Sequence, residues 1–312
     1  MNAVTTFALP VLRRVALLVS LLAIVFVAVD LLPGSAARSA LGREAGQAEL
    51  TAKEHELGLD RALPVQFWHW LTGVLTGDLG QSARGNSIGA MLADKFPQTL
   101  LLGGLALLLT VVLSLGLGCW WAMRPTALGS RILQPTSTIA VAVPEFVCGT
   151  VLILIFSLAT GWLPAVTITD RSGFPAGPEM LVLPVLALAI PQIGWNTRVV
   201  RSALLDVAAA PHVHSAVLDG LPTHTVLFRH MLPFAAPAIV AGYATSVGML
   251  FGGALVVETL FNYPGVGAVL AGSVADRDTA TVAAVVALTA IVIMVLLAAA
   301  DFVRTWAARG AR

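Results

Sequence analysis

Charged side chains are scarce in this sequence. Asp, Glu, Lys and Arg together make up 11% of its 312 residues, and the formal net charge is +1. An average soluble domain carries about 25% charged residues. Here 57% of the residues are hydrophobic and the mean hydropathy is +0.88. We therefore expect a membrane protein. The basic residues are scattered between apolar runs and form no continuous basic face, which excludes nucleic-acid binding.

Cysteine and lysine are also rare. The two cysteines, Cys119 and Cys148, lie inside apolar segments, so no disulfide framework is indicated. The only lysines, Lys53 and Lys95, stand outside any G-x-x-x-x-G-K-[ST] pattern. The chain therefore lacks a P-loop, and any ATP-driven step requires a separate protein.

Long apolar runs dominate the remaining sequence. A membrane-spanning helix needs roughly 20 mostly apolar residues, and backbone groups in hydrocarbon must bond within their own segment, which favours helices over open strands. The fold class predicted is all-α with six transmembrane helices. They are expected near residues 15–32, 99–123, 132–163, 181–200, 237–261 and 279–300.

Arginine placement predicts the orientation, because basic residues in short loops stay on the cytoplasmic side. Arg13 and Arg14 place the N-terminus inside, and the short outer loops then hold only Arg171 and Arg277. The remaining arginines that follow the first span and its long loop fall inside: Arg124, Arg131, Arg198, Arg201, Arg229, Arg304, Arg309 and Arg312. Both termini are thus predicted to be cytoplasmic. The first apolar run exceeds the 7–15 residues of a signal peptide, so we expect it to be retained.

An extracytoplasmic segment, residues 33–98, separates the first two predicted spans. It contains a charged stretch, ELTAKEHELGLD, and then an amphipathic one, VQFWHWLTGVLTGDLG. We expect Phe67, Trp68, Trp70 and Leu71 to lie along the outer membrane surface or to pack against the ends of the spans. A contact surface for an external partner is compatible with either arrangement.

Two weak patterns suggest other chemistries. Gly85–Gly89 matches the G-x-S-x-G motif of α/β-hydrolases, but no strand-like run precedes it, and Ser87 lies outside whereas most histidines lie inside. The histidines His212, His214, His224 and His230 suggest a metal site, yet no cysteine and few acids stand nearby. We expect ordinary surface histidines, with neither a catalytic residue nor a metal ligand in this chain.

A polar loop between two apolar runs carries the most specific pattern. His214–Pro233 reads HSAVLDGLPTHTVLFRHMLP, in which Ser215 and Ala216 are followed by Gly220 and then by Leu232 and Pro233. This spacing resembles the "EAA" loop of ATP-binding cassette (ABC) importer permeases. A solvated connector without a partner is the alternative, since glycine and proline are common in turns.

Further segments resemble the dipeptide/oligopeptide/nickel permease family of these importers. They are LLPG, ELGLDRALPVQFWHWLTGVLTGDLGQS, VPEF, ETLFNYPGVG and Asp301-Phe302-Val303-Arg304, in that order along the chain. The resemblance implies a type I ABC importer permease in the bacterial inner membrane. It also implies four kinds of neighbour: a second homologous permease, two ABC ATPases, an extracytoplasmic substrate-binding protein and membrane lipids.

The resemblance further implies a function and its cofactors. The chain would be a transporter subunit that imports di- or oligopeptides, with nickel or a metal chelate as the alternative cargo. ATP and Mg²⁺ would be bound by the partner ATPases, not by this chain, which is no enzyme itself. An ion-coupled secondary transporter is the alternative of another class; it requires coupling acids near mid-membrane and usually repeated halves, and the sequence shows no convincing repeat.

Within the loop, residues 213–227 are expected to form one short coupling helix in a cleft of an ATPase. Ala216 and Gly220 would allow close approach, and Leu221 would fill a pocket. The family pattern has an acidic or polar residue where His214 stands, and an apolar one where His230 stands. The predicted coupling residues are His214, Ser215, Ala216, Asp219, Gly220, Leu221, His224, Arg229, Leu232 and Pro233.

Polar and helix-breaking residues inside the spans are candidates for the translocation path. Glu145 follows Pro144 within the third predicted span, and Pro191 with Gln192 predicts a similar interruption of the fourth. The alternative for Glu145 is a residue at the cytoplasmic edge of an overlong span. Gly248 and Gly252 form a G-x-x-x-G helix-packing pattern, possible at a seam with the second permease. Asp30 and Glu258 are expected at exposed outer ends of spans, with capping or structural roles. The organisation predicted is a single transmembrane domain over residues 1–312, in which residues 99–305 form the core and residues 206–234 form the coupling loop.

Overall fold

A computed structural model describes the backbone of residues 3–42, 44–171 and 173–310, and the side chains of residues 13–42, 44–171 and 173–299. The chain divides into two compact units. One contains the residues up to Pro97 together with Gly265–Ile291, and the other contains Gln98–Pro264 together with the residues from Val292 onward. The described residues form helices and no β-strand beyond two isolated bridges, which confirms the all-α prediction.

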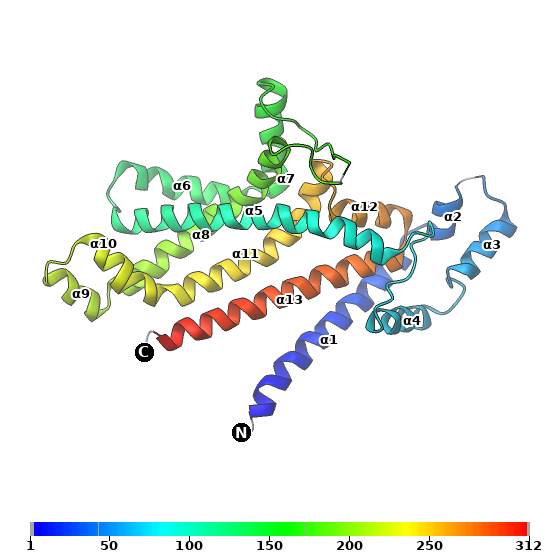
Figure 1. Cartoon of the computed structure of the whole chain (residues 1–312), viewed down its shortest axis with the longest axis horizontal. Helices are drawn as coiled ribbons and strands as arrows, with labels where there is room; N and C mark the ends of the chain where they lie inside the picture. Colours follow the sequence, from blue (N-terminus) through cyan, green and yellow to red (C-terminus); the bar gives the residue numbers. More distant parts are fainter. Residues whose placement is uncertain (1–2, 43, 172, 311–312) are drawn as a thin grey trace. The chain divides into compact units, whose positions relative to one another are not determined.

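The first unit contains four helices from the N-terminal part of the chain and one from the C-terminal part, and the starts of α5 and α13 belong to it too (Figure 1). The bounds are α1 Ala3–Asp30, α2 Ala36–Leu41, α3 Gln47–Glu56, α4 Leu63–Leu75 and α12 Val266–Asp276. Helix α4 packs on α1, because the Phe26 ring lies 5.3 Å from the rings of both Phe67 and Trp70. Trp68, by contrast, is exposed. Two of the predicted interfacial aromatics therefore pack against α1.

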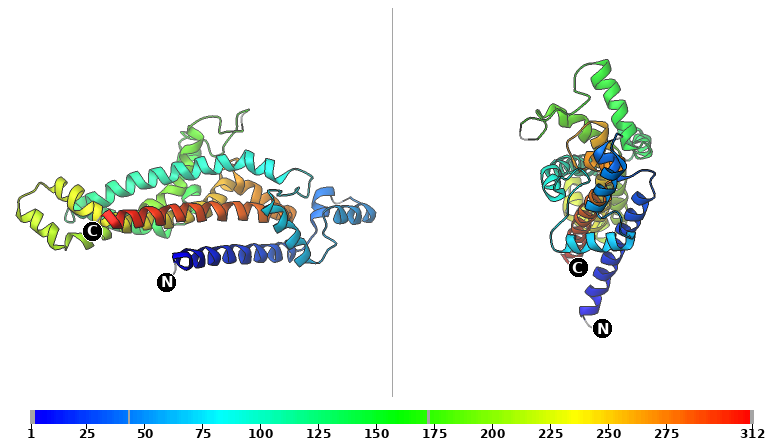
Figure 2. Two further views of the ribbon diagram at one scale, coloured as in Figure 1. Left: turned by 60° about the horizontal axis from the view of Figure 1, so that its bottom comes forward. Right: turned by 90° about the vertical axis from the view of Figure 1, so that its right-hand side faces the viewer.

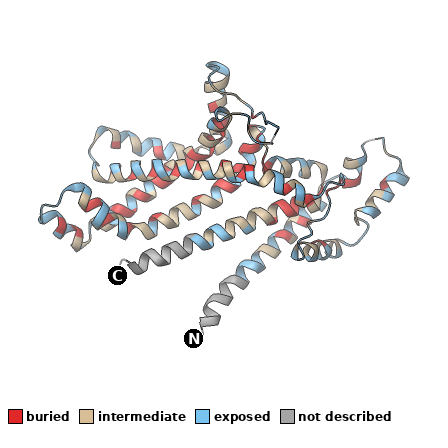
Figure 3. Ribbon diagram, in the orientation of Figure 1, coloured by how far each residue is buried: buried red, intermediate tan, exposed pale blue. Residues whose placement is uncertain are grey.

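The second unit is organised around helix α8. Its bounds are α5 Ile88–Met123 (from Gln98), α6 Leu128–Ala142, α7 Glu145–Leu152, η1 Ile153–Ala159, α8 Glu179–Ala208, α9 Pro211–Leu218, α10 Thr223–Thr225, η2 Val226–Met231, α11 Leu232–Leu260 and α13 Thr279–Gly310 (from Val292). Helix α8 packs against α6, α7 and α11. Figure 3 shows the buried residues concentrated along it.

Glycines allow other helices to approach α8 closely. A β-carbon at Gly118 of α5 would lie 2.6 Å from Cβ of Val200, and one at Gly194 of α8 would lie 2.8 Å from the carbonyl oxygen of Ser137 in α6. Both distances are shorter than carbon contacts tolerate. Small residues are the usual means of close helix packing in membranes, so these positions require glycine.

Four helices with described residues are long and apolar enough to cross a membrane, and the bent pair α6 and α7–η1 makes a fifth if it counts as one span. The side chains of α1 are described only from Arg13 onward, and α1 is not among these helices. Residues 1–2 and 311–312, where the chain ends, lie outside the described residues, as do the side chains of Asp301 to Arg312. Six spans and cytoplasmic termini therefore stay predictions.

Two prolines expected to interrupt spans behave differently. Helix α6 ends at Ala142, and α7 begins at Glu145 after a bend of 107°. Val143 is extended, with φ −91° and ψ 120°, because a following proline disfavours the helical region. The predicted interruption at Pro191 and Gln192, however, is wrong. Helix α8 runs unbroken through both residues, which are buried among α6, α7 and α11, and this packing offsets the missing backbone hydrogen bond.

Candidate functional site

The polar loop folds as a helix and a turn at one end of α8 and α11, as Figures 1 and 2 show from different directions. Helix α9 begins at Pro211 after an extended Ala210. Proline suits this first position because its ring fixes a helical φ and its nitrogen has no hydrogen to leave unbonded. The helix thus starts two residues before the predicted Val213.

The end of α9 is fixed by Gly220. Its φ is +76°, a left-handed conformation that glycine adopts without steric cost. The Gly220 N–H donates to the Val217 carbonyl oxygen at 3.1 Å, and the Leu221 N–H donates to that of Ala216 at 3.2 Å. These two bonds form a Schellman motif. The single helix predicted over residues 213–227 is therefore wrong, because α9 ends at Leu218 and Pro222 precedes the next helix.

The inner face of α9 packs within the chain. Val213 and Ala216 are buried in a cluster that includes Val200 and Leu204 of α8 and Met231 of η2. Ala216 is 3% exposed. The prediction that Ala216 allows a partner to approach is therefore corrected: its small side chain allows α9 to pack on this chain's own helices.

The outer face of the same loop is apolar at several positions. Val217, Leu218, Leu221 and Phe228 are exposed, with Leu218 reaching 73%. Most other members of the predicted coupling set are also exposed, namely His214, Ser215, Asp219, Gly220, His224, Arg229 and Pro233. Leu232 is half-buried. An exposed apolar surface with polar neighbours is typical of an interaction site.

A histidine links α9 to the start of α11. Nε2 of His212 lies 3.0 Å from the carbonyl oxygen of His230, and the His212 ring lies 4.4 Å from that of Phe234. His212 thus serves as a link between helices. The described residues include no group of three or more histidines, cysteines or acids placed to hold a metal ion.

The candidate path residues lie on different helices. Pro144 and Glu145 stand where α7 begins, and a β-carbon at Gly253 of α11 would lie 3.2 Å from the Glu145 carboxyl carbon. Glu145 is half-buried. Gln192 is buried in α8, and its Oε1 atom has no hydrogen-bond partner among the described residues. The bend therefore brings the Glu145 carboxylate against the face of α11 that bears Gly253.

Buried polar residues not singled out from the sequence connect the helices. Asn196 Nδ2 on α8 donates to Oγ of Ser246 on α11 at 2.6 Å and to the Gln192 carbonyl oxygen at 2.8 Å. The hydroxyls of Tyr243 on α11 and Ser114 on α5 lie 2.9 Å apart. These residues could have been found from the sequence as polar residues within apolar runs, because such side chains form hydrogen bonds between helices in membranes.

Glu258 is fully buried, so its predicted exposure to headgroups and water is wrong. Its Oε1 atom accepts a hydrogen bond from Oγ1 of Thr99 on α5 at 2.6 Å. A buried carboxyl group requires such donors. Glu258 therefore connects α11 to α5.

Gly248 and Gly252 do not mediate close helix packing among the residues that the structure describes. A β-carbon at either position would meet no atom of the described residues within 4 Å. The neighbouring Thr245, Met249 and Val256 are exposed, so α11 presents an uncovered strip of small and apolar residues. The possible role of the two glycines at a seam between permeases stays a prediction.

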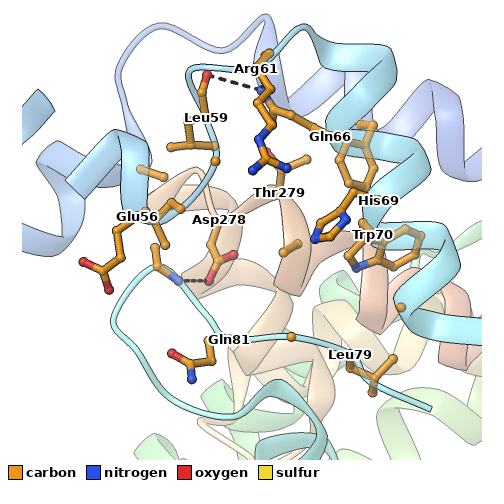
Figure 4. Close-up of a pocket in the computed structure, with 18 of the residues that line it drawn as sticks. Glu56, Leu59, Arg61, Gln66, His69, Trp70, Leu79, Gln81, Asp278 and Thr279 are labelled. Carbon is orange, nitrogen blue, oxygen red and sulfur yellow. Dashed lines mark hydrogen bonds between the residues drawn. The ribbon is translucent and has the colours of Figure 1, made fainter. Parts of the chain in front are cut away.

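A cavity of about 380 Å³ lies in the first unit, where Figure 4 shows Arg61, His69 and Trp70 around it. Asp278 lies on its far wall and accepts a hydrogen bond from the Ala83 N–H at 2.8 Å. Asp278 also accepts bonds from both the N–H and the hydroxyl of Thr281 and so caps α13. The loop before α5 is thereby attached to the start of α13.

The G-x-S-x-G segment has a structural role. The Ser87 hydroxyl oxygen accepts a bond from the Ala90 N–H at 3.4 Å, at the start of α5. A serine in this position caps a helix. The segment precedes a helix but follows no strand, so the geometry of a hydrolase nucleophile is not formed here.

Two family models match the sequence. Residues 114–312 match the model described as "Binding-protein-dependent transport system inner membrane component", and residues 7–103 match the N-terminal model of the same kind of membrane component. Together they extend over both units.

Individual proteins are also similar. A probable peptide ABC transporter permease protein, y4tP of Sinorhizobium fredii, is 31% identical over 86% of this chain and 88% of its own length. A glutathione transport system permease protein, GsiC of Pectobacterium atrosepticum, is 33% identical over 84% of this chain and 83% of its own. A solved structure of the inward-facing MetNI methionine ABC transporter superposes with a TM-score of 0.58 at 15% identity, covering 70% of this chain and 96% of the other. The last comparison shows a shared fold.

Proposed function

Because this chain belongs to the family of binding-protein-dependent transport system inner membrane components, we propose that it forms the membrane path of an importer of di- or oligopeptides. It is a multi-pass protein of the bacterial inner membrane and a permease of the peptide-type ABC importers. It is a transporter component, and importers of this family work in general with ATPase and substrate-binding protein partners.

The names of the relatives support a peptide cargo. One is named for peptides and others for glutathione, which is itself a small peptide. Glu145 offers a carboxylate that suits the ammonium group of a peptide, and it stands at the bend between α6 and α7. We propose that Glu145 borders the path.

The proposed assembly contains this chain, a second related permease and two ATPases. In this proposal, the present chain crosses the membrane six times and has cytoplasmic termini. Helix α9 then lies on the cytoplasmic side, where the ATPases bind. The exposed Leu218 and Leu221 would enter a cleft of one ATPase. The open side of Gly248 and Gly252 on α11 would face the second permease.

The packing of α9 supports a coupling role. Its inner face contacts both α8 and η2, which continues into α11. A displacement of α9 by a closing ATPase would therefore move two long helices together, as rigid-body switching requires. The main support for this proposal is that α9 has an exposed apolar outer face and an inner face packed on this chain's own helices.

Copurification from mild detergent tests the docking surface. We expect the wild-type chain to retain the ATPases and the second permease. Leu218→Asp and Leu221→Asp should lose the ATPases, because a carboxylate would be buried in an apolar contact. Leu75→Asp is the control matched to Leu218→Asp, since Leu75 is 79% exposed, close to the 73% of Leu218, but lies at the end of α4 in the other unit.

If both loop variants recover as much ATPase as the wild-type chain does, the docking proposal is refuted. Cargo is tested separately by uptake into vesicles that contain the complete transporter, using a labelled tripeptide and labelled nickel in parallel. Uptake of nickel without uptake of any peptide would refute the peptide assignment while leaving the docking surface intact.

A further inference from the structure

A second cavity, of about 500 Å³, lies on the surface of the second unit beside the C-terminal half of α8. Helix α8 contributes Trp195, Arg198 and Arg201 to its lining, and α5 contributes Trp121. The other lining residues are polar or aliphatic, and none is acidic: Gln134, Thr138, Val199 and Ser202. The cavity therefore presents two positive charges and uncharged hydrogen-bonding groups.

Arg201 packs on an aromatic ring and has no polar partner among the described residues. Its guanidinium carbon lies 4.4 Å from the centre of the Trp121 ring, and Trp121 is 5% exposed. The Arg201 Nε atom is buried and has no hydrogen-bond partner among the described residues. A buried donor without an acceptor is costly, so this arrangement suits an acceptor that a ligand supplies.

Arg198 stands one helical turn before Arg201, so both side chains reach the same side of α8. Neither arginine forms an ion pair with any residue that the structure describes. Guanidinium groups match phosphate oxygens through paired hydrogen bonds. The pair thus favours a phosphate group as the ligand.

The surroundings of the cavity suit the membrane–water interface. Tryptophan and arginine gather at the ends of membrane spans, and here two tryptophans flank two arginines near the end of α8. Helix α6, which supplies Gln134 and Thr138, also exposes Ile132 at 56% and Ile139 at 62%. The same helix thus bears both polar residues that line the cavity and exposed apolar residues suited to acyl chains.

We propose that this cavity binds the phosphate of an anionic phospholipid headgroup, with the acyl chains lying along α6. Basic pockets between transmembrane helices are known to bind such headgroups. Free phosphate presents the same oxygens, but it makes no use of the exposed isoleucines. The lipid site is separate from peptide transport and does not depend on the cargo.

Native mass spectrometry of the full-length chain tests the proposal. The chain is released from nanodiscs that contain phosphatidylglycerol and phosphatidylcholine in equal amounts. Wild type should retain phosphatidylglycerol preferentially. Arg198→Gln and Arg201→Gln should each weaken this retention about tenfold, which corresponds to one lost charge-assisted contact, while retention of phosphatidylcholine stays the same.

Arg131→Gln is the matched control, because Arg131 is an exposed arginine of α6 that does not line the cavity. Arg198 is exposed, so its variant tests the site even if Arg201→Gln disturbs the packing on Trp121. Equal phosphatidylglycerol retention in wild type and Arg198→Gln would overturn the proposal. So would displacement of all bound phosphatidylglycerol by inorganic phosphate at a similar concentration, which would indicate a site for the free ion.

Discussion

The Nε2 atom of His212 lies 3.0 Å from the carbonyl oxygen of His230, and this contact joins α9 to the segment that leads into α11. The imidazole also packs on the Phe234 ring. This side chain therefore adds a polar contact to the apolar packing between the proposed docking helix and the helical segment Thr223–Leu260.

Replacing His212 should separate ATPase docking from transport. In His212→Ala the exposed leucines of α9 remain, so we expect the ATPases to copurify as with wild type. Uptake per ATP hydrolysed should fall several-fold, because α9 loses its polar contact with the segment that leads into α11 and transmits its movement less fully. His55→Ala, at an exposed histidine in the other unit, is the control. If uptake per ATP hydrolysed in His212→Ala equals that of the wild type, the contact between His212 and His230 does not contribute to coupling.

The turn after α9 predicts a selective tolerance at Gly220. Gly220→Ala should destabilise the helix end by about 1–2 kcal/mol, because alanine is strained at a φ of +76°. Gly220→Asn should be milder, since asparagine adopts the left-handed region more readily. Hydrogen exchange of α9 amides measures the difference. Equal protection in the two variants would contradict the assigned turn.

Two glycines on α5 should respond oppositely to alanine. Gly118→Ala places a methyl group 2.6 Å from Cβ of Val200 and should cost about 1–3 kcal/mol of stability. Gly116→Ala meets no described atom within 4 Å and should be neutral or stabilising by up to about 1 kcal/mol. Unfolding in a denaturing detergent compares them. The helix packing described here is wrong if both substitutions have the same effect.

A double-mutant cycle tests the bond between Asn196 and Ser246. Hydrogen bonds between membrane helices contribute about 0.6 kcal/mol on average and at most about 1.7 kcal/mol. We expect Asn196→Ala and Ser246→Ala to show a coupling energy in this range. Asn196→Ala alone should cost more than Ser246→Ala, because the bond from Asn196 to the Gln192 carbonyl oxygen, at 2.8 Å, is shorter than the bond from Ser246 to the Gly242 carbonyl oxygen, at 3.3 Å. Strictly additive effects would exclude the bond.

Glu145 should act on the charged end of a peptide. In Glu145→Gln the apparent KM for peptides with a free amino group should rise roughly tenfold, the loss expected for one charge-assisted bond. Uptake of N-acetylated peptides should stay the same. Glu179→Gln, at an exposed acid that begins α8, is the control. An equal effect on both kinds of peptide would assign Glu145 a structural role instead.

Several features of this protein could be predicted from the sequence because they depend on local chemistry. Long apolar runs allow only helices in a bilayer, and the described residues are indeed helical. Gly220 and Pro222 carry the local signal for the end of α9, because one residue adopts a left-handed turn and the other disfavours a continuing helix. The predicted single helix over residues 213–227 overlooked that signal. The loop pattern also indicated the correct family.

Tertiary structure decided what local chemistry left open. Pro144 and Pro191 carry the same local signal, yet the chain bends by 107° before Glu145 and continues as helix through Pro191. The difference arises from burial, because Pro191 lies in a helix enclosed by three others. Likewise, only the folded chain shows that Ala216 faces inward while Leu218 faces outward. Sequence spacing determines which residues share a face, but contacts between distant segments determine which face is covered.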